Sequence, residues 1–264
     1  MRRHGLRPRR PFGQNFLVDR SVVERIAAAV GPRPGLRIVE IGAGLGTLTR
    51  ALQAGGSAVV AIERERDMVR ALRADFEAGG GVTVMEVDAV TFDYRAAATG
   101  SPTAVAGNLP YNLTGPLLGA IVDSIDALVA AVVMVQREVA ERMVAAPGSR
   151  TYGALSVMVQ ARCDAEVVLE VPPDAFYPAP EVHSMVVRLV PSRPPRIGGR
   201  DWEKVRRIVR AAFAQRRKKL RNALRSLAPQ ELVEASLTRA GIDPSRRAET
   251  LSVEDFARLA DELG

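Results

Sequence analysis

The chain has 264 residues, of which 47% are hydrophobic and 25% charged, a composition typical of a globular protein with room for one large domain and a smaller one. Its formal net charge is +7, and it contains one cysteine and two histidines. A single cysteine excludes an internal disulfide and a thiolate metal cluster, and two histidines argue against a histidine-based metal site, so we expect a cytoplasmic protein without a metal.

The N-terminal segment MRRHGLRPRR carries five arginines and lacks the apolar stretch of a secretory signal. Its composition is also compatible with a transit peptide, although it is very short for one. No apolar run reaches the ~18 residues that a membrane-spanning helix needs. Residues 22–30 are apolar at helical spacing and stop at Gly31-Pro32, which predicts a helix.

From residue 36 onward, short apolar runs alternate with segments of helical periodicity. Strands are predicted at 36–42, 58–63, 82–88, 103–108 and 128–136, and helices near 47–54, 65–77, 114–124 and 137–145. Because these strands are continuously apolar and alternate with helices, the sequence predicts an α/β fold with a parallel sheet covered on both faces.

The pattern changes after residue 150. Residues 151–163 are predicted to be helical, and two further strands, at 165–171 and 182–190, are joined by a proline-rich loop without a crossover helix. These two strands therefore predict an antiparallel pair at one edge of the sheet. Residues 191–199 have the composition of a linker, and only helices are predicted beyond it, one of them beginning at a capping box of Ser252 and Asp255. We expect two domains, at residues 1–192 and 200–264.

A glycine-rich turn follows the first strand of the sheet, in VEIGAGLGTLT (39–49). Gly42 and Gly44 allow the backbone to turn tightly and to lie against a ligand at a helix N-terminus. Thr47 stands where the dinucleotide fingerprint has glycine or alanine, which argues against NAD. The carboxylate of Glu40 would repel a diphosphate but attract an ammonium and a sulfonium, so the predicted ligand is S-adenosyl-L-methionine, with S-adenosylhomocysteine as its product.

Two further carboxylates close the next two strands. Glu63 ends the second strand, where it would accept hydrogen bonds from the ribose hydroxyls, and Asp88, followed by Ala89, ends the third strand, where the adenine edge would lie. Glycine turns and strand-end acids also occur in α/β proteins that bind no such ligand. Here the glycine turn, Glu63 and Asp88 occur at three consecutive strand ends, and this combination favours a binding site for S-adenosyl-L-methionine.

The fourth strand ends in Asn108-Leu109-Pro110-Tyr111, and Pro110 cannot donate to a ladder. An exocyclic adenine amine is a poor nucleophile, because its lone pair is delocalised into the ring. The side-chain carbonyl of Asn108 and the backbone carbonyl of Leu109 would accept its N–H bonds and aim the lone pair, while Tyr111 stacks on the base. We predict methyl transfer to an extruded adenine without a His or Lys base. The alternative is a turn that closes a strand.

Between Lys204 and Arg221 there are nine Lys or Arg residues and no acidic residue. Such clustering is typical of a surface that binds a phosphate backbone, although a solvated helix face has a similar composition. The residues predicted to bind RNA, here called the basic segment, are Arg216, Arg217, Lys218, Lys219 and Arg221.

Six segments together resemble the KsgA/RsmA family of small-subunit (16S) ribosomal RNA adenine N6,N6-dimethyltransferases: FGQNFLVD (12–19), EIGAGLGTLT (40–49), VDA (87–89), NLPYN (108–112), FYPAPEVHSMVVRL (176–189) and FAQRRKKLRNAL (213–224). The resemblance implies a Rossmann-like class I methyltransferase sheet with a small all-helical C-terminal domain. It also implies dimethylation of two adjacent adenines, in a hairpin loop near the 3′ end of small-subunit rRNA, within an assembling 30S subunit. We expect a monomer.

The resemblance assigns further site residues. Asn15 and Leu17 would cover the methionine part of the donor, and Phe176 would form a second wall for the target base, opposite Tyr111. The other donor-binding positions of the family match Gly42, Glu63, Asp88 and Asn108. The alternative for Phe176 is a core residue beneath a proline-rich loop. The sequence departs from the family pattern at Ala43, Val87 and His183.

Two other functions compete with this interpretation. An Erm-type enzyme would methylate large-subunit rRNA, but FYPAPEVHS and RRKKLRN favour the KsgA/RsmA family. A protein that acts mainly as a checkpoint of subunit assembly would bind the immature subunit, with methylation incidental. Replacing Asn108 by alanine separates the checkpoint role from catalysis, because binding to the subunit should survive while methyl transfer falls.

Overall fold

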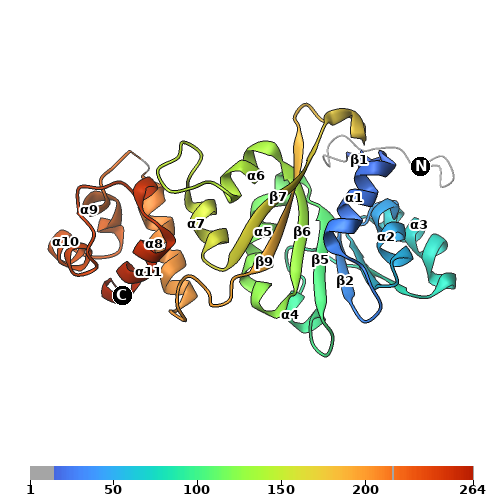
Figure 1. The fold of residues 1–264 in the computed structure, drawn as a ribbon, viewed down its shortest axis with the longest axis horizontal. Coiled ribbons are helices and arrows are strands. Elements are labelled where there is room, and N and C mark those ends of the chain that lie inside the picture. Colours follow the sequence, from blue (N-terminus) through green and yellow to red (C-terminus); the bar gives the residue numbers. More distant parts are fainter. Residues whose placement is uncertain (1–14, 216, 264) are drawn as a thin grey trace. The chain divides into compact units, whose positions relative to one another are not determined.

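The structure is a computed structural model that describes residues 15–215 and 217–263 (Figure 1). The chain divides into two compact units. The first contains the described residues up to Ala140 together with Glu166–Val190, and the second contains Glu141–Ala165 together with the described residues from Pro191 onward. Among the described residues, no helix combines the length and the apolar composition required to cross a bilayer.

A seven-stranded sheet with the order β4-β3-β2-β5-β6-β9-β7 forms the centre of the fold. Its strands are β2 (Arg37–Ile41), β3 (Ala58–Glu63), β4 (Val82–Glu86), β5 (Thr103–Asn108), β6 (Ala130–Gln136), β7 (Cys163–Val171) and β9 (Ser184–Pro191). Strands β2 to β6 pair in parallel, and β9 pairs antiparallel with β6. The predicted α/β fold is confirmed, and both late strands lie at one edge of the sheet, with β7 outermost.

The helices of the first unit lie close to the predicted ranges, except for one short helix near residue 95 that was not predicted. They are α1 (Arg20–Val30), α2 (Thr47–Ala54), α3 (Arg66–Phe76), α4 (Tyr94–Ala97), α5 (Thr114–Ser124) and, shared between the two units, α6 (Arg137–Met143). The Asp19 side chain accepts the backbone N–H groups of Ser21 and Val22 at the start of α1, and Gly31 ends this helix with a φ of 70°. Local capping residues therefore set both ends of α1.

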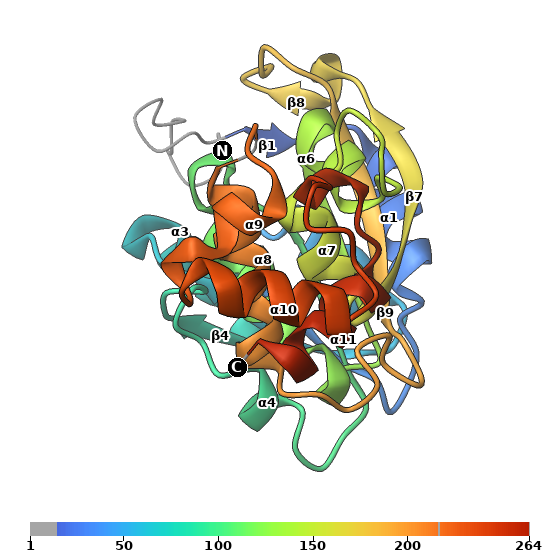
Figure 2. The same ribbon diagram turned by 90° about the vertical axis from the view of Figure 1, so that its left-hand side faces the viewer.

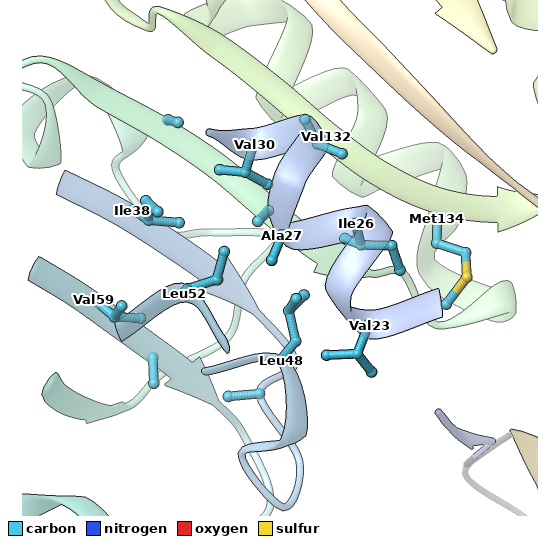
Figure 3. Close-up of a cluster of buried hydrophobic side chains, with 14 of the residues drawn as sticks. Val23, Ile26, Ala27, Val30, Ile38, Leu48, Leu52, Val59, Val132 and Met134 are labelled. Atoms are coloured by element: carbon cyan, nitrogen blue, oxygen red, sulfur yellow. The ribbon is translucent and has the colours of Figure 1, made fainter. Parts of the chain in front are cut away.

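One face of the sheet is covered by α1, α2 and α3. Figure 3 shows how apolar side chains of α1 and α2 meet those of β2, β3 and β6; the labelled residues are Val23, Ile26, Ala27, Val30, Ile38, Leu48, Leu52, Val59, Val132 and Met134. All ten of these side chains are buried, and Ile38 and Leu52 are fully buried. Because the helices are fixed by this core, the loops that enter them at the carboxyl ends of the strands have defined positions.

The second unit is helical. It contains α7 (Ala154–Gln160), α8 (Trp202–Ala214), α9 (Leu220–Ala223), α10 (Gln230–Arg239) and α11 (Val253–Glu262), and Figure 2 shows α8 to α11 in orange and red. The predicted capping box at the start of α11 is confirmed, since Ser252 and Asp255 exchange hydrogen bonds of 3.0 and 3.2 Å.

The segment Glu141–Ala165 groups with these C-terminal helices, whereas the sequence placed it in a domain of residues 1–192. The physical reason is packing. Tyr152 and Val157 are fully buried in the cluster formed by α8 and α11, and the Tyr152 hydroxyl donates to the Leu251 carbonyl at 2.8 Å. The assignment of separate functional domains to residues 1–192 and 200–264 stays a prediction.

A second, two-stranded sheet was not predicted. Strands β1 (Phe16–Leu17) and β8 (Phe176–Tyr177) pair antiparallel, with Phe16 opposite Tyr177 and Leu17 opposite Phe176. This pairing joins positions that are 161 and 159 residues apart in the chain. Strands of two residues carry no periodicity, so only the tertiary structure could reveal them.

Candidate functional site

A cavity of about 400 Å³ lies at the carboxyl ends of the central strands. Its lining includes the end of β2, β3 and β5, the glycine turn, and part of β1. In open parallel sheets, ligands bind at this edge, and cavities of 300–1,000 Å³ are typical of small-molecule sites. The cavity therefore has the place and the size expected for the donor site.

Most of the residues predicted from the sequence line this one cavity: Asn15, Leu17, Gly42, Gly44, Glu63, Asp88, Ala89, Asn108, Leu109, Pro110 and Tyr111. Two positions that depart from the family pattern, Ala43 and Val87, also line it. The lining residues that sequence reasoning missed include Phe16, Arg64, Met68, Leu117 and Met134. Arg64 directly follows Glu63, a predicted ligand residue, so its position in the sequence could have indicated that it lines the cavity. The four apolar lining residues cannot be distinguished from core residues in the sequence.

The glycine turn is held in place by Glu63. Gly42 and Gly44 have φ values of 64° and 57°, in the left-handed region where a side chain causes strain. The Gly44 N–H donates to Oε2 of Glu63 at 3.0 Å, and the Arg64 and Glu65 N–H groups donate to Oε1 at 2.7 and 2.9 Å. Oε1 already accepts two bonds, whereas Oε2 accepts one and keeps a further lone pair, so Glu63 retains the capacity to accept a hydrogen bond from the ribose.

Asp88 is partly engaged by protein groups. Its Oδ1 accepts the Val90 N–H at 2.9 Å, and its Oδ2 forms an ion pair with Nη1 of Arg64 at 3.2 Å. The Arg64 side chain is 62% exposed, and an exposed pair of this kind contributes at most about 1 kcal/mol. An adenine edge that reached Asp88 would therefore displace Arg64 at little cost.

Glu40 is buried beneath the glycine turn, with 2% of its surface exposed, and its Oε2 has no hydrogen-bond partner among the described residues. Burial raises the pKa of this carboxyl to about 8; the polar groups of Thr49 oppose the shift, and the negative charge of Glu63 adds to it. A cationic ligand in the cavity would favour the ionised form. The arrangement thus supports the predicted preference for a sulfonium and an ammonium.

Asn108 presents a second buried acceptor. Its Nδ2 donates to the backbone carbonyl of Asn15 at 3.2 Å, which leaves Oδ1 as the remaining acceptor. This Oδ1 is buried and has no hydrogen-bond partner among the described residues. An unsatisfied buried acceptor costs about 1–3 kcal/mol, so a ligand N–H that reaches it gains this energy.

The aromatic ring beside Asn108 is fixed by a distant residue. The Tyr111 hydroxyl lies 3.1 Å from Oγ of Ser184, a fully buried residue at the start of β9. Leu109, next to Asn108, is held by its N–H to the Met134 carbonyl at 3.0 Å. The segment after β5 therefore has both its backbone and its ring anchored to neighbouring strands.

The structure does not bring Phe176 to the cavity. Its side chain is 4% exposed and belongs to the hydrophobic cluster that α1, α2, α3 and the sheet form. Its neighbour Tyr177 is 57% exposed. The side chain of Phe176 lies on the same face of the two-stranded sheet as that of Leu17, its direct partner.

The described members of the basic segment belong to the second unit: Arg217, Lys218 and Lys219 lie between α8 and α9, and Arg221 lies in α9. Arg217, Lys218 and Lys219 are exposed and Arg221 is half-buried, whereas Arg216 lies outside the described residues. None of the four described members forms an ion pair with another described residue, and Lys219 acts on the carboxyl of Asp243 only through its charge, so these cations are available to phosphates. Within the described part of the chain, no three His, Cys, Asp or Glu side chains are arranged to hold a metal ion.

Comparison with known proteins identifies relatives over the whole chain. The sequence profile described as "Ribosomal RNA adenine dimethylase" matches residues 5–264. The chain is 46% identical to "Ribosomal RNA small subunit methyltransferase A" of Anaeromyxobacter sp. (strain K), over 99% of this chain and 95% of that protein. It is 48% identical to the protein of the same description from Methylococcus capsulatus (strain ATCC 33009 / NCIMB 11132 / Bath), over 97% of this chain and 98% of the relative.

Two solved structures share the fold. The crystal structure of the 23S rRNA methyltransferase ErmE has a TM-score of 0.71 and 26% identity, over 94% of this chain and 99% of that one. A dimethyladenosine transferase from Plasmodium falciparum has a TM-score of 0.75 and 23% identity, over 92% of this chain and 95% of that one. The architecture is thus that of known methyltransferases.

Proposed function

The chain belongs to the ribosomal RNA adenine dimethylase family, and we propose that it transfers methyl groups from S-adenosyl-L-methionine to the N6 amines of two adjacent adenines in a hairpin loop near the 3′ end of small-subunit rRNA. One observation carries the proposal. The glycine turn, its acidic partners and the unpartnered Oδ1 of Asn108 line a single cavity, so a methyl donor and an acceptor amine would meet there.

The residues present fit the donor. Glu40 supplies a buried acceptor that has no partner in the described part of the chain, which suits a cation, and Gly42 and Gly44 provide a turn without side chains. Glu63 would accept the ribose hydroxyls and Asp88 would lie at the adenine edge, while Asn15 and Leu17 would cover the methionine part. S-adenosyl-L-methionine supplies an electrophilic methyl group on a sulfonium and leaves as the neutral thioether S-adenosylhomocysteine.

Asn108 is the central residue of the part of the cavity that would hold the adenine. Its Oδ1 would accept an N–H of the adenine amine, which draws the lone pair out of conjugation with the ring and turns it toward the donor. Tyr111, held by Ser184, would stack on the extruded base and fix its plane. The amine proton leaves to water after the bond has formed, so no side chain needs to act as a strong base. The role of Phe176 as a second wall stays a prediction.

The substrate and its context complete the proposal. Relatives described as small subunit methyltransferase A support small-subunit rRNA within an assembling 30S subunit as the target. The exposed cations of the basic segment would bind its phosphates. We further propose that the protein is a monomer that works in the cytoplasm.

The test is incubation of purified protein with labelled donor and with either small or large ribosomal subunits that lack the modification, followed by mapping of the labelled nucleotides. We expect N6,N6-dimethyladenine at two adjacent positions of small-subunit rRNA. Label on large-subunit rRNA would instead support the Erm-type alternative. Asn108→Ala is the loss-of-function control: it should abolish transfer.

The assembly-checkpoint alternative is addressed by the same variant. If Asn108→Ala binds immature subunits as tightly as the wild type, binding and catalysis are separable functions of one chain. If binding is lost together with transfer, the extruded base supplies most of the affinity, and a checkpoint role independent of catalysis is refuted.

A further inference from the structure

The two-stranded sheet of β1 and β8 has two different faces. Figure 2 shows these strands side by side, and their register places Phe16 opposite Tyr177 and Leu17 opposite Phe176. Directly opposed side chains lie on the same face, and successive ones alternate. Leu17 and Phe176 therefore share one face, which packs against the hydrophobic core.

The opposite face is apolar, and two of its three side chains are exposed whereas Phe16 is half-buried. It carries Phe16 and Tyr177, and Val18 continues it, because the Val18 N–H extends the pairing by a 2.9 Å hydrogen bond to the Ala175 carbonyl. Tyr177 is 57% exposed and Val18 55%. We call these three residues, Phe16, Val18 and Tyr177, the ribbon face.

The ribbon face is continuous with the cavity. Phe16 lines the cavity, and its ring lies 3.4 Å from the position that a Cβ on Gly44 would occupy. The preceding residue, Asn15, accepts the hydrogen bond from Asn108. Opposed Cα atoms in an antiparallel pair are about 4.5–5.5 Å apart, so Tyr177 begins one strand spacing from the cavity wall.

We propose that the ribbon face is a stacking platform on which Tyr177 receives the nucleobase next to the adenine that enters the cavity. The inference rests on the proposed function. When one base leaves a single-stranded stack, its neighbour loses a stacking partner, and an exposed aromatic ring beside the entry point replaces that partner. Such stacking accepts any base, so Tyr177 contributes affinity without reading sequence.

The size of the ribbon face favours a nucleobase over a second copy of the chain. A stable protein interface buries about 800 Å² on each partner, whereas three side chains cover only a fraction of that area. One aromatic ring flanked by a small aliphatic side chain matches the area of a single base. The ring position is also defined, because the backbone of Tyr177 is fixed by its pairing with Phe16.

The test compares Tyr177→Ala and Tyr177→Phe in the full chain, with Val167→Ala as the matched control. Val167 is another exposed apolar residue of the first unit, 41% exposed, on β7. The probe is a single-stranded RNA oligonucleotide that carries adjacent adenines, with 2-aminopurine beside them as a fluorescent reporter of stacking. Affinity for this probe and the quenching of its fluorescence are measured, together with donor affinity and sedimentation of the free protein.

We expect Tyr177→Ala to weaken binding of the probe roughly tenfold and to remove the quenching, because one stacked base is lost. Tyr177→Phe and Val167→Ala should stay within about twofold of the wild type, and donor affinity should be the same in all. The proposal is overturned if Tyr177→Ala binds and quenches like the wild type, or if Tyr177→Phe loses as much as Tyr177→Ala. A change in self-association in Tyr177→Ala would make a second copy the occupant and would also overturn it. Failure of the wild type to methylate any rRNA, with the tyrosine series behaving as expected, would refute the proposed function instead.

Discussion

Replacing Glu40 by glutamine tests the electrostatics on which the donor site depends. Glutamine has nearly the same shape but carries no ionisable proton. In the folded protein the pKa of Glu40 is raised from 4.5 to about 8 by burial. Between these two values the folded protein holds a proton that the unfolded chain has released, so the stability of the wild type falls as the pH rises. Below pH 4.5 Glu40 is protonated in both the folded and the unfolded state, and above about pH 8 the loss of stability is complete.

The magnitude follows from the width of this interval. One pKa unit corresponds to about 1.36 kcal/mol, so an interval of about three and a half pH units sets an upper limit of about 5 kcal/mol. The Glu40→Gln variant lacks this pH-dependent loss of stability. Without ligand, its stability relative to the wild type should therefore increase by roughly 1.4 kcal/mol for each pH unit between 5 and 8, and the difference should level off above 8. All other ionisations cancel in this comparison.

Urea unfolding of the wild type and the variant, at several pH values between 5 and 9, measures this difference. A difference that is constant over the whole range would refute the raised pKa. A second measurement uses the donor: calorimetry at pH 7 in two buffers of different ionisation enthalpy should detect proton release when S-adenosyl-L-methionine binds to the wild type but not to the variant. Binding of donor without proton release would show that the charge of Glu40 is not coupled to the ligand.

Other contacts give further expected outcomes. Ser184→Ala removes the hydrogen bond to Tyr111, so methyl transfer should fall several-fold at unchanged donor affinity, and Tyr111→Phe should add little to it in a double-mutant cycle. Gly46→Ala places a Cβ 2.4 Å from the Phe76 ring at a φ of 76°, so urea unfolding should show a loss of roughly 2–4 kcal/mol, whereas Gly79→Ala, with open space around it, is the control. Replacing the four described cations of the basic segment by glutamine should make the slope of log Kd against log salt for single-stranded RNA shallower by up to about 3, and an unchanged slope would remove them from the interface.

The sequence by itself determined the strands of the main sheet, the helices between them and the residues at the strand ends. These features are encoded locally. Continuous apolar runs such as 103–108 specify buried strands, Gly31 ends a helix, and the Ser252 capping box starts another. Because parallel strands place their carboxyl ends at one edge, the order of elements alone was enough to bring Glu63 and Asn108 to the same cavity.

Only the tertiary structure decided which atoms of these residues are engaged and which are left without a partner. The bond from Asn108 to Asn15 joins positions 93 residues apart, and that from Tyr111 to Ser184 joins positions 73 apart. The pairing of β1 with β8 places the side chain of Phe176 in the core and leaves that of Tyr177 exposed. Two-residue strands and single side-chain contacts have no periodic pattern in the sequence, so they are specified by packing between distant segments.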